Sequence, residues 1–144
     1  MGGDSLRRIV IMLALCLALA TWALPLHPVA ETTMMILITS LTIVHVSTPL
    51  VIRLSRVAGA IDMPGGRKIH ASPTPRWGGM AIYAGVVTAL VLGASAYMPN
   101  LKAMIIGSSL ILVVGLLDDV IGVRASLKLA VQVAACAVLI ADGV

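Results

Sequence analysis

Residues 103–119 read AMIIGSSLILVVGLLDD, an uncharged apolar stretch that ends in two adjacent carboxylates, Asp118 and Asp119. A stretch of this kind is typical of a helix in hydrocarbon, where an unpaired charge is costly and marks function. The pair therefore predicts that the helix ends at a membrane surface, where the two acids hold a cation or take part in chemistry. Two solvated acids that merely mark the end of the helix are the alternative, which is weakened because negative charge at a helix C-terminus is mildly unfavourable.

The whole chain has the composition of an integral membrane protein. Of its 144 residues, 60% are hydrophobic and 11% are charged, and the mean hydropathy is +1.08. A soluble domain of this length could not bury so much apolar surface. Uncharged apolar stretches occupy 9–30, 32–52, 77–101, 103–117 and 129–141. They predict an all-α fold, a polytopic bundle of about five transmembrane helices, with the last two helices near 100–119 and 123–141.

The basic residues predict the orientation of these spans. Cytoplasmic segments carry an excess of Lys and Arg, whereas acidic residues contribute little. With the amino terminus inside, nine of the ten Lys and Arg residues fall on the cytoplasmic side, and Lys102 alone falls outside. Segment 62–79 and the Asp118–Asp119 pair then both face the cytoplasm. The net charge of +4 fits contact with anionic lipid, so we expect a membrane surface and no nucleic acid as partner.

The first apolar run, which follows Arg7 and Arg8, fits either a signal peptide or a retained helix. We favour a retained helix at about 6–25, an extra anchor, because the apolar stretch is long for a signal peptide and Pro25 closely follows Ala23, after which cleavage would occur. Removing this helix would leave the orientation of the other spans unchanged.

Segment 62–79 reads DMPGGRKIHASPTPRWGG and contains three prolines, four glycines and four ionisable basic side chains. Proline and glycine end a helix, so the segment interrupts the spans. Glycine-rich backbone lets amide groups approach a phosphate closely, while basic side chains hold its oxygens. The segment therefore predicts a phosphate or pyrophosphate site, although an ordinary basic cytoplasmic loop would have a similar composition.

Asp118 and Asp119 are the candidate metal ligands. Mg²⁺ takes oxygen ligands and is usually held by one or two carboxylates together with substrate phosphates. It would neutralise pyrophosphate charge and polarise a phosphorus centre. One acid could instead serve as a base toward a phosphate nucleophile, since like charges in proximity raise one pKa. The residue pattern alone does not divide these roles between the two acids.

Arg124, Lys128 and Gln132 follow the acids at a spacing of four residues. This spacing places them on one face of the next helix. Polar side chains in hydrocarbon face the bundle interior or an aqueous cleft, so we expect Lys128 and Gln132 to reach toward the acids. Extension of the Lys128 side chain to the membrane interface is the alternative.

Three blocks of residues, in this order, resemble the polyprenyl-phosphate N-acetylhexosamine-1-phosphate transferases. They are Asp-x-Pro-x-x-Arg-Lys-x-His, Pro-Thr-Pro-Arg-x-Gly-Gly, and Gly-x-x-Asp-Asp followed by Lys and Gln. The residues that carry them are Asp62, Pro64, Arg67, Lys68 and His70; Pro73, Thr74, Pro75, Arg76, Gly78 and Gly79; and Gly115, Asp118, Asp119, Lys128 and Gln132. The resemblance covers about 41–141. The second block is closer to the branch that uses UDP-N-acetylglucosamine than to the muramoyl-pentapeptide branch, where Pro-Thr-Met-Gly-Gly is usual.

The resemblance implies transfer of N-acetylhexosamine-1-phosphate from a UDP-amino sugar to undecaprenyl phosphate, and we favour N-acetylglucosamine-1-phosphate as the transferred group. This step starts cell-envelope glycan synthesis at the cytoplasmic face of the bacterial inner (plasma) membrane. Mg²⁺ is the implied cofactor, with Mn²⁺ as a substitute, and the implied partners are the polyprenyl phosphate carrier and the UDP-amino sugar. A homodimer is left open.

The same resemblance implies roles for individual residues. Asp118 and Asp119 would bind the metal or activate the lipid phosphate. The basic residues would contact substrate phosphates, namely Arg67, Lys68, His70, Arg76 and Lys128. The other loop residues would shape the loop, namely Asp62, Pro64, Pro73, Thr74, Pro75, Gly78 and Gly79.

One departure from the family is the length of the chain. Relatives normally have many more spans, and their later cytoplasmic loops supply another Asp and a His-rich segment. We therefore expect residues 1–144 to be the amino-terminal portion of a membrane-embedded sugar-phosphate transferase domain, from a longer protein or a truncated gene product, and to be inactive alone.

Other functions are less well supported by the sequence. The alternatives are a phospho-N-acetylmuramoyl-pentapeptide transferase, or a non-catalytic membrane subunit or transporter fragment whose basic loop only follows the positive-inside rule. An intramembrane prenyltransferase would place a third acid where Gly122 stands, and the longer Asp/Gly pattern of a CDP-alcohol phosphotransferase is absent.

Overall fold

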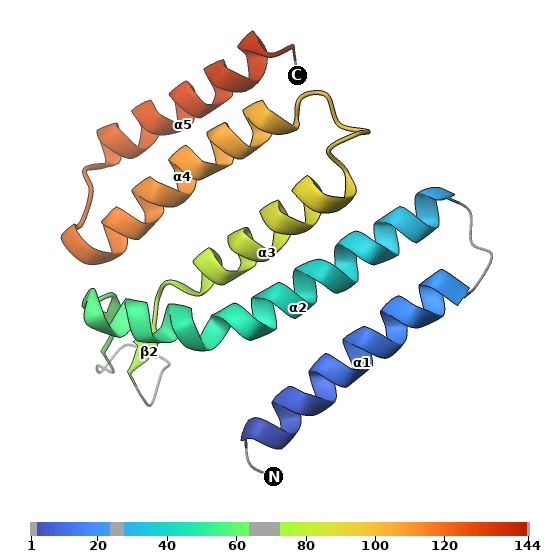
Figure 1. Cartoon of the computed structure of the whole chain (residues 1–144). Helices are drawn as coiled ribbons and strands as arrows, with labels where there is room; N and C mark the ends of the chain where they lie inside the picture. The colour runs from blue at the N-terminus through green and yellow to red at the C-terminus, as the bar shows by residue number, and fades with distance from the viewer. Residues whose placement is uncertain (1–2, 24–27, 64–72, 144) are drawn as a thin grey trace. The chain divides into compact units, whose positions relative to one another are not determined.

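The computed structural model of the chain describes residues 3–23, 28–63 and 73–143. Within these ranges the chain forms helices and one short pair of strands (Figure 1). The helices are α1 (Gly3–Ala23), α2 (Pro28–Val57), α3 (Gly78–Gly93), α4 (Leu101–Ile121) and α5 (Ala125–Ala141), and the strands are β1 (Ile61–Asp62) and β2 (Thr74–Pro75). The predicted all-α class is confirmed, and α4 and α5 lie within two residues of their predicted bounds.

The helix predicted at about 6–25 corresponds to α1, which ends at Ala23, and α2 begins at Pro28, whose fixed φ suits a first helical turn. The apolar stretch 77–101 is helical only in part. The helix α3 ends at Gly93, and the chain then turns ahead of Pro99, which disfavours helical backbone in the residue before it.

The distribution of apolar side chains is that of a protein surrounded by lipid. Six of the nine buried hydrophobic residues in the described ranges are alanines, whereas many large apolar side chains on the helices are exposed, among them Leu92 and Ile140 at 72% each. Such a surface would be unfavourable in water. By length and composition, α2 and α4 can each cross a bilayer, whereas α3, α5 and the Arg8–Leu17 part of α1 are shorter apolar helices. The helical membrane class is confirmed, and the count of five spans stays a prediction.

The chain divides into two compact units. The first comprises Met1–Thr48 and Ala81–Met98. Within it, α2 and α3 approach closely at Gly85, where a Cβ atom would lie 2.6 Å from Cγ2 of Val44 and 2.8 Å from the carbonyl oxygen of Ser40. The glycine therefore permits the contact between the two helices.

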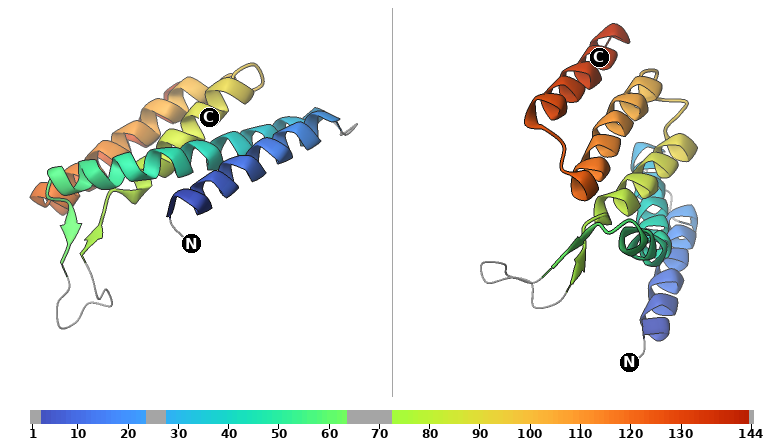
Figure 2. Two further views of the ribbon diagram at one scale, coloured as in Figure 1. Left: turned by 60° about the horizontal axis from the view of Figure 1, so that its bottom comes forward. Right: turned by 90° about the vertical axis from the view of Figure 1, so that its left-hand side faces the viewer.

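The second unit comprises Pro49–Met80 and Pro99–Val144 and contains the acids. Within it, α4 and α5 lie side by side as a hairpin (Figures 1 and 2). A Cβ atom at Gly107 would lie 3.3 Å from the carbonyl oxygen of Ala135, which allows close packing. The helix α4 ends at Gly122, whose φ of +68° is left-handed and whose N–H donates to the carbonyl oxygen of Asp118 at 3.1 Å.

The same unit holds the antiparallel pair of β1 and β2, in which Ile61 lies opposite Pro75 and Asp62 opposite Thr74. The ladder was not predicted from the sequence. It is supported by the hydroxyl of Ser55, a fully buried side chain near the end of α2, which donates to the carbonyl oxygen of Ala60 at 2.5 Å. The ladder holds Asp62, at the start of the 62–79 segment, beside Thr74 and Pro75.

Candidate functional site

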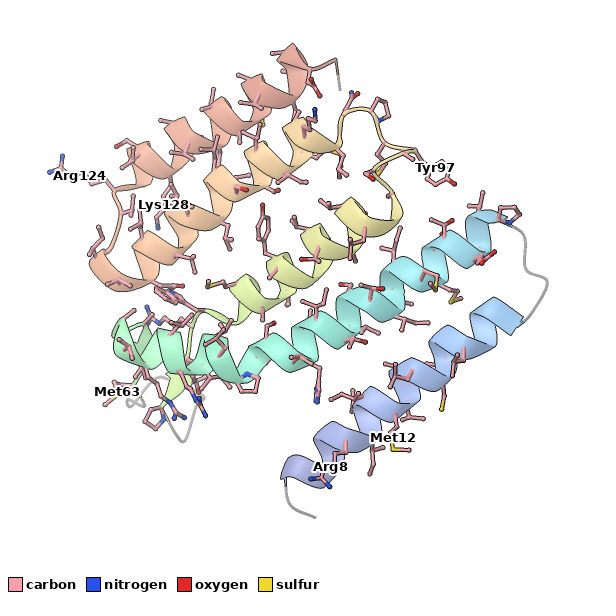
Figure 3. The ribbon with its side chains drawn as sticks, in the orientation of Figure 1. Arg8, Met12, Met63, Tyr97, Arg124 and Lys128 are labelled. Atoms are coloured by element: carbon pink, nitrogen blue, oxygen red, sulfur yellow. The ribbon has the colours of Figure 1, made fainter. Side chains whose placement is uncertain are left out.

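Asp118 is held by contacts on both of its carboxylate oxygens. Its Oδ2 accepts a hydrogen bond from Nζ of Lys128 at 2.7 Å, and its Oδ1 accepts one from the backbone N–H of Val123 at 2.9 Å. The side chain of Lys128 extends from α5 toward α4, whereas that of Arg124, at the start of α5, points away (Figure 3). The structure thus brings Lys128 to the acids and leaves Arg124 apart from them.

A small cavity of about 140 Å³ lies on this side of Asp118, between α4 and α5. Its lining includes Gly115, Asp118, Lys128 and Gln132. Gln132, one helical turn beyond Lys128, therefore faces the same space, as its spacing predicts.

Asp119 faces a different cavity, of about 310 Å³. The polar part of its lining comes from Asp118, Asp119 and Arg76, and the apolar part includes Trp77, Met80 and Leu116. Asp119 is half-buried and, among the described residues, makes no hydrogen bond or ion pair. Its carboxylate oxygens are thus available to an incoming group.

Arg76 reaches this cavity from the end of the β1–β2 ladder. Its Nη2 donates to Oδ1 of Asp62 at 2.9 Å, and its backbone N–H donates to the carbonyl oxygen of Ala60 at 3.0 Å. The hydrogen bond and the charge of Asp62 raise the pKa of Arg76, and the charges of Asp119 and Asp118 raise it further. Arg76 is therefore a permanent cation at the cavity, held from one side by Asp62.

The remaining residues of the sequence blocks are described only in part. Pro64, Arg67, Lys68 and His70 lie outside the described residues. Pro73, Thr74 and Pro75 lead into and form β2. Gly78 and Gly79 are the first residues of α3, and a Cβ atom at either would meet nothing within 4 Å, so packing does not explain these glycines.

Trp77 was not predicted to belong to the site, because it occupies the unspecified position, x, of the second block. The structure places it in the wall of the Asp119 cavity. Its indole Nε1 is buried and has no hydrogen-bond partner among the described residues. The sequence did contain a signal, since Trp77 is a rare aromatic residue, in a chain with 3% aromatics, inside a polar segment.

The chain is similar in sequence to curated transferases. The probable undecaprenyl-phosphate N-acetylglucosaminyl 1-phosphate transferase of Bacillus subtilis is 34% identical over 106 residues, which cover 74% of this chain and 30% of that protein. Two decaprenyl-phosphate N-acetylglucosaminephosphotransferases are similar over 115 residues, which cover 74% of this chain and 28% of each: that of Mycolicibacterium smegmatis is 35% identical and that of Mycobacterium tuberculosis 33%.

The chain spans less than a third of the length of these curated relatives. No family model matches the chain. No solved structure matches it either.

Proposed function

Because the chain is homologous over 74% of its length to polyprenyl-phosphate N-acetylglucosamine-1-phosphate transferases, we propose that it provides part of the active site of such an enzyme. The reaction transfers N-acetylglucosamine-1-phosphate from UDP-N-acetylglucosamine to a polyprenyl phosphate. The resemblance of the three sequence blocks to this family agrees with the names of these relatives. The muramoyl-pentapeptide alternative is not favoured, since the relatives named above act with N-acetylglucosamine.

One observation carries this proposal. Residues from three separate parts of the sequence meet in one compact unit, where Arg76 shares a cavity with Asp118 and Asp119 while Lys128 is bonded to Asp118. Two cations beside two carboxylates suit a reaction between phosphates, because the cations hold phosphate oxygens and the carboxylates bind a metal or accept a proton. The transporter and non-catalytic alternatives give no reason for this convergence.

The proposed reaction is a displacement at phosphorus. An oxygen of the lipid phosphate attacks the phosphorus that bears the sugar, and the bond from this phosphorus to the bridging oxygen of UDP breaks. The electron pair leaves with UMP. Arg76 and Lys128 would reduce the repulsion between the two anionic reactants and orient them, and catalysis of phosphate transfer consists mainly of positioning and charge stabilisation.

The donor set fits Mg²⁺ bound jointly with substrate. No group of three or more His, Cys, Asp or Glu side chains gathers among the described residues. Mg²⁺ does not need such a group, because it keeps several waters and is usually bound through one or two carboxylates plus substrate phosphates. The Asp118–Asp119 pair would supply the carboxylate that holds it, and when bound it would neutralise pyrophosphate charge. Mn²⁺ would substitute for it.

We further propose a multi-pass arrangement in the bacterial inner membrane, with the acids and segment 62–79 on the cytoplasmic face. The positive-inside distribution supports this orientation, since Lys102 alone of the ten Lys and Arg residues falls on the other side. The same face would receive the UDP-sugar, while the apolar surface of the helices would face lipid. A homodimer is compatible with this arrangement.

A chimeric protein tests the function. Residues 1–144 replace the matching segment of the Bacillus subtilis relative, and membranes containing the chimera are assayed for Mg²⁺-dependent exchange of radiolabelled UMP into UDP-N-acetylglucosamine. We expect exchange by the chimera and none by residues 1–144 alone, since these residues match less than a third of the relatives. No exchange by a well-folded chimera would contradict the proposal and favour a non-catalytic membrane protein. Exchange by residues 1–144 alone would contradict the proposed dependence on further segments.

A further inference from the structure

We infer that the two adjacent carboxylates have different roles, with Asp118 as a positioning residue for Lys128 and Asp119 as the carboxylate that offers its oxygens to the ligand in the larger cavity. That the ligand is a divalent cation held with substrate phosphate rests on the proposed function. That the two carboxylates differ in role rests only on the geometry of the second unit.

The geometry of the helix explains why neighbours in sequence differ in their surroundings. Successive residues of an α-helix point about 100° apart around its axis. Asp118 and Asp119 both lie in the last turn of α4, so only one of them can face α5 squarely. Asp118 is that residue, since Lys128 of α5 donates to it, while Asp119 faces the cavity that Arg76 and Trp77 line.

Asp118 is committed to the turn between the helices. Its backbone carbonyl accepts from the N–H of Gly122, its Oδ1 from the N–H of Val123, and its Oδ2 from Nζ of Lys128. These three bonds tie the end of α4 to the start of α5 and hold the Lys128 ammonium at a defined point. A carboxylate whose charge is already matched by an ammonium at 2.7 Å attracts a further cation less strongly than an unpaired one.

Asp119 has the opposite character. Among the described residues its carboxylate accepts no hydrogen bond and forms no ion pair. Arg76, the cation in the lining of its cavity, is already bonded to Asp62. A half-buried carboxylate without a hydrogen bond or ion pair gains most from a bound cation, because the cation replaces the solvation that burial removes. We therefore assign direct contact with the cation to Asp119, and the positioning of Lys128 to Asp118.

Cation binding tests the role of Asp119 without any assay of catalysis. Tb³⁺ is an oxygen-preferring cation whose emission is sensitised by a nearby indole, and Trp77 lines the same cavity as Asp119. Residues 1–144 are purified in detergent with Trp22→Phe, which leaves Trp77 as the one tryptophan of the chain. We expect sensitised Tb³⁺ emission, an affinity lower by more than about tenfold in Asp119→Asn, and a smaller loss in Asp118→Asn. Mg²⁺ should compete with Tb³⁺.

Lysine labelling tests the role of Asp118. Purified protein is exposed briefly to an amine-reactive reagent, and modification of Lys128 is measured by mass spectrometry relative to Lys102, an exposed lysine at the other end of α4. We expect Asp118→Asn to raise the relative labelling of Lys128 several-fold and Asp119→Asn to leave it unchanged. Partial unfolding would not give this result, because it would also expose other lysines. It would not be limited to the Asp118 variant either.

The outcomes separate this inference from the proposed function. Equal loss of Tb³⁺ affinity in both variants, a larger loss in Asp118→Asn, or no sensitised emission from the parent protein would overturn the division, as would unchanged labelling of Lys128 in Asp118→Asn. If the expected Tb³⁺ and labelling patterns are found but the chimera shows no UMP exchange, the division stands and the transferase function fails.

Discussion

Arg76 and Asp62 form an ion pair of 2.9 Å although they lie 14 positions apart in sequence, because the β1–β2 ladder pairs Asp62 with Thr74, two residues before Arg76. In this pair, Nη2 of the guanidinium is bonded to Asp62, while Arg76 also lines the cavity that Asp119 lines. Asp62, placed by resemblance among the loop residues, thus contacts the basic residue of the second block directly.

The first prediction concerns this pair. Asp62→Asn removes the charge that orients Arg76, so we expect the chimeric transferase to lose activity through a higher KM for the UDP-sugar. The unfolding temperature should change little, since the Arg76 side chain is 42% exposed and exposed ion pairs contribute little to stability. Steady-state kinetics and thermal unfolding in detergent measure the two effects. Unchanged kinetics in Asp62→Asn would show that the pair does not serve the site.

Lys128 and Arg124 offer a matched comparison on one helix. Lys128→Met removes the cation bonded to Asp118, and we expect the chimera to lose more than about tenfold in kcat/KM, as for a charge-assisted contact to phosphate. Arg124→Gln removes a cation that points away from α4, so its effect should be small (Figure 3). Equal losses in the two variants would indicate that general basicity of this helix, and not the contact with Asp118, matters.

Much of the fold was readable from the sequence because apolar stretches of this length have few other structures. The runs that became α4 and α5 were placed within two residues, since Gly122 and the adjacent charges end the apolar pattern on both sides. The apolar composition continues beyond Gly93, where α3 ends, so hydropathy alone does not give the end of this helix. Hydropathy reports burial in lipid, and it does not report where a helix stops.

The sequence predicted which residues belong to the candidate site, but not how they are arranged. The spacing of Lys128 predicted its approach to the acids, whereas nothing in the pattern could tell Asp118 from Asp119, since their difference arises from the angle between successive helical residues and from the turn at Gly122. The β1–β2 ladder was missed because strands of two residues, one containing Pro75, are too short to show alternation. The roles of all these residues in catalysis stay predictions.

Gly85 provides a stability prediction for the first unit. A Cβ atom there would lie 2.8 Å from a backbone oxygen of α2, so Gly85→Ala requires the two helices to shift and should destabilise the protein by about 1–3 kcal/mol. Gly115→Ala is the control, because a Cβ atom at Gly115, also within a helix, meets nothing within 4 Å. Alanine should there be neutral or stabilising by up to about 1 kcal/mol. Thermal unfolding of residues 1–144 in detergent would contradict this packing if both variants behaved alike.

Trp77 has a buried indole N–H without a partner among the described residues, which predicts an unusual response to substitution. A buried unpaired donor costs about 1–3 kcal/mol, and Trp77→Phe removes it while keeping an aromatic ring in the cavity wall. We expect the unfolding free energy of Trp77→Phe to equal or exceed that of the parent, and that of Trp77→Ala to fall. A marked loss of stability in Trp77→Phe would contradict the proposed cost of an unpaired indole N–H.

The orientation of the spans can be tested in intact cells. After Cys16 and Cys136 are replaced by Ser, a single cysteine is introduced at Lys102 or at Arg124, which are exposed at opposite ends of the α4–α5 hairpin. If the acids face the cytoplasm, a membrane-impermeant thiol reagent should label the cysteine at 102 in intact cells and the cysteine at 124 only after the inner membrane is permeabilised. The reverse pattern would place Asp118 and Asp119 outside, where the proposed cytoplasmic UDP-sugar could not reach them, so the orientation and the function would fail together. Labelling at both positions in intact cells would show that the hairpin does not cross the membrane, and the positive-inside distribution would then reflect contact with anionic lipid at a surface.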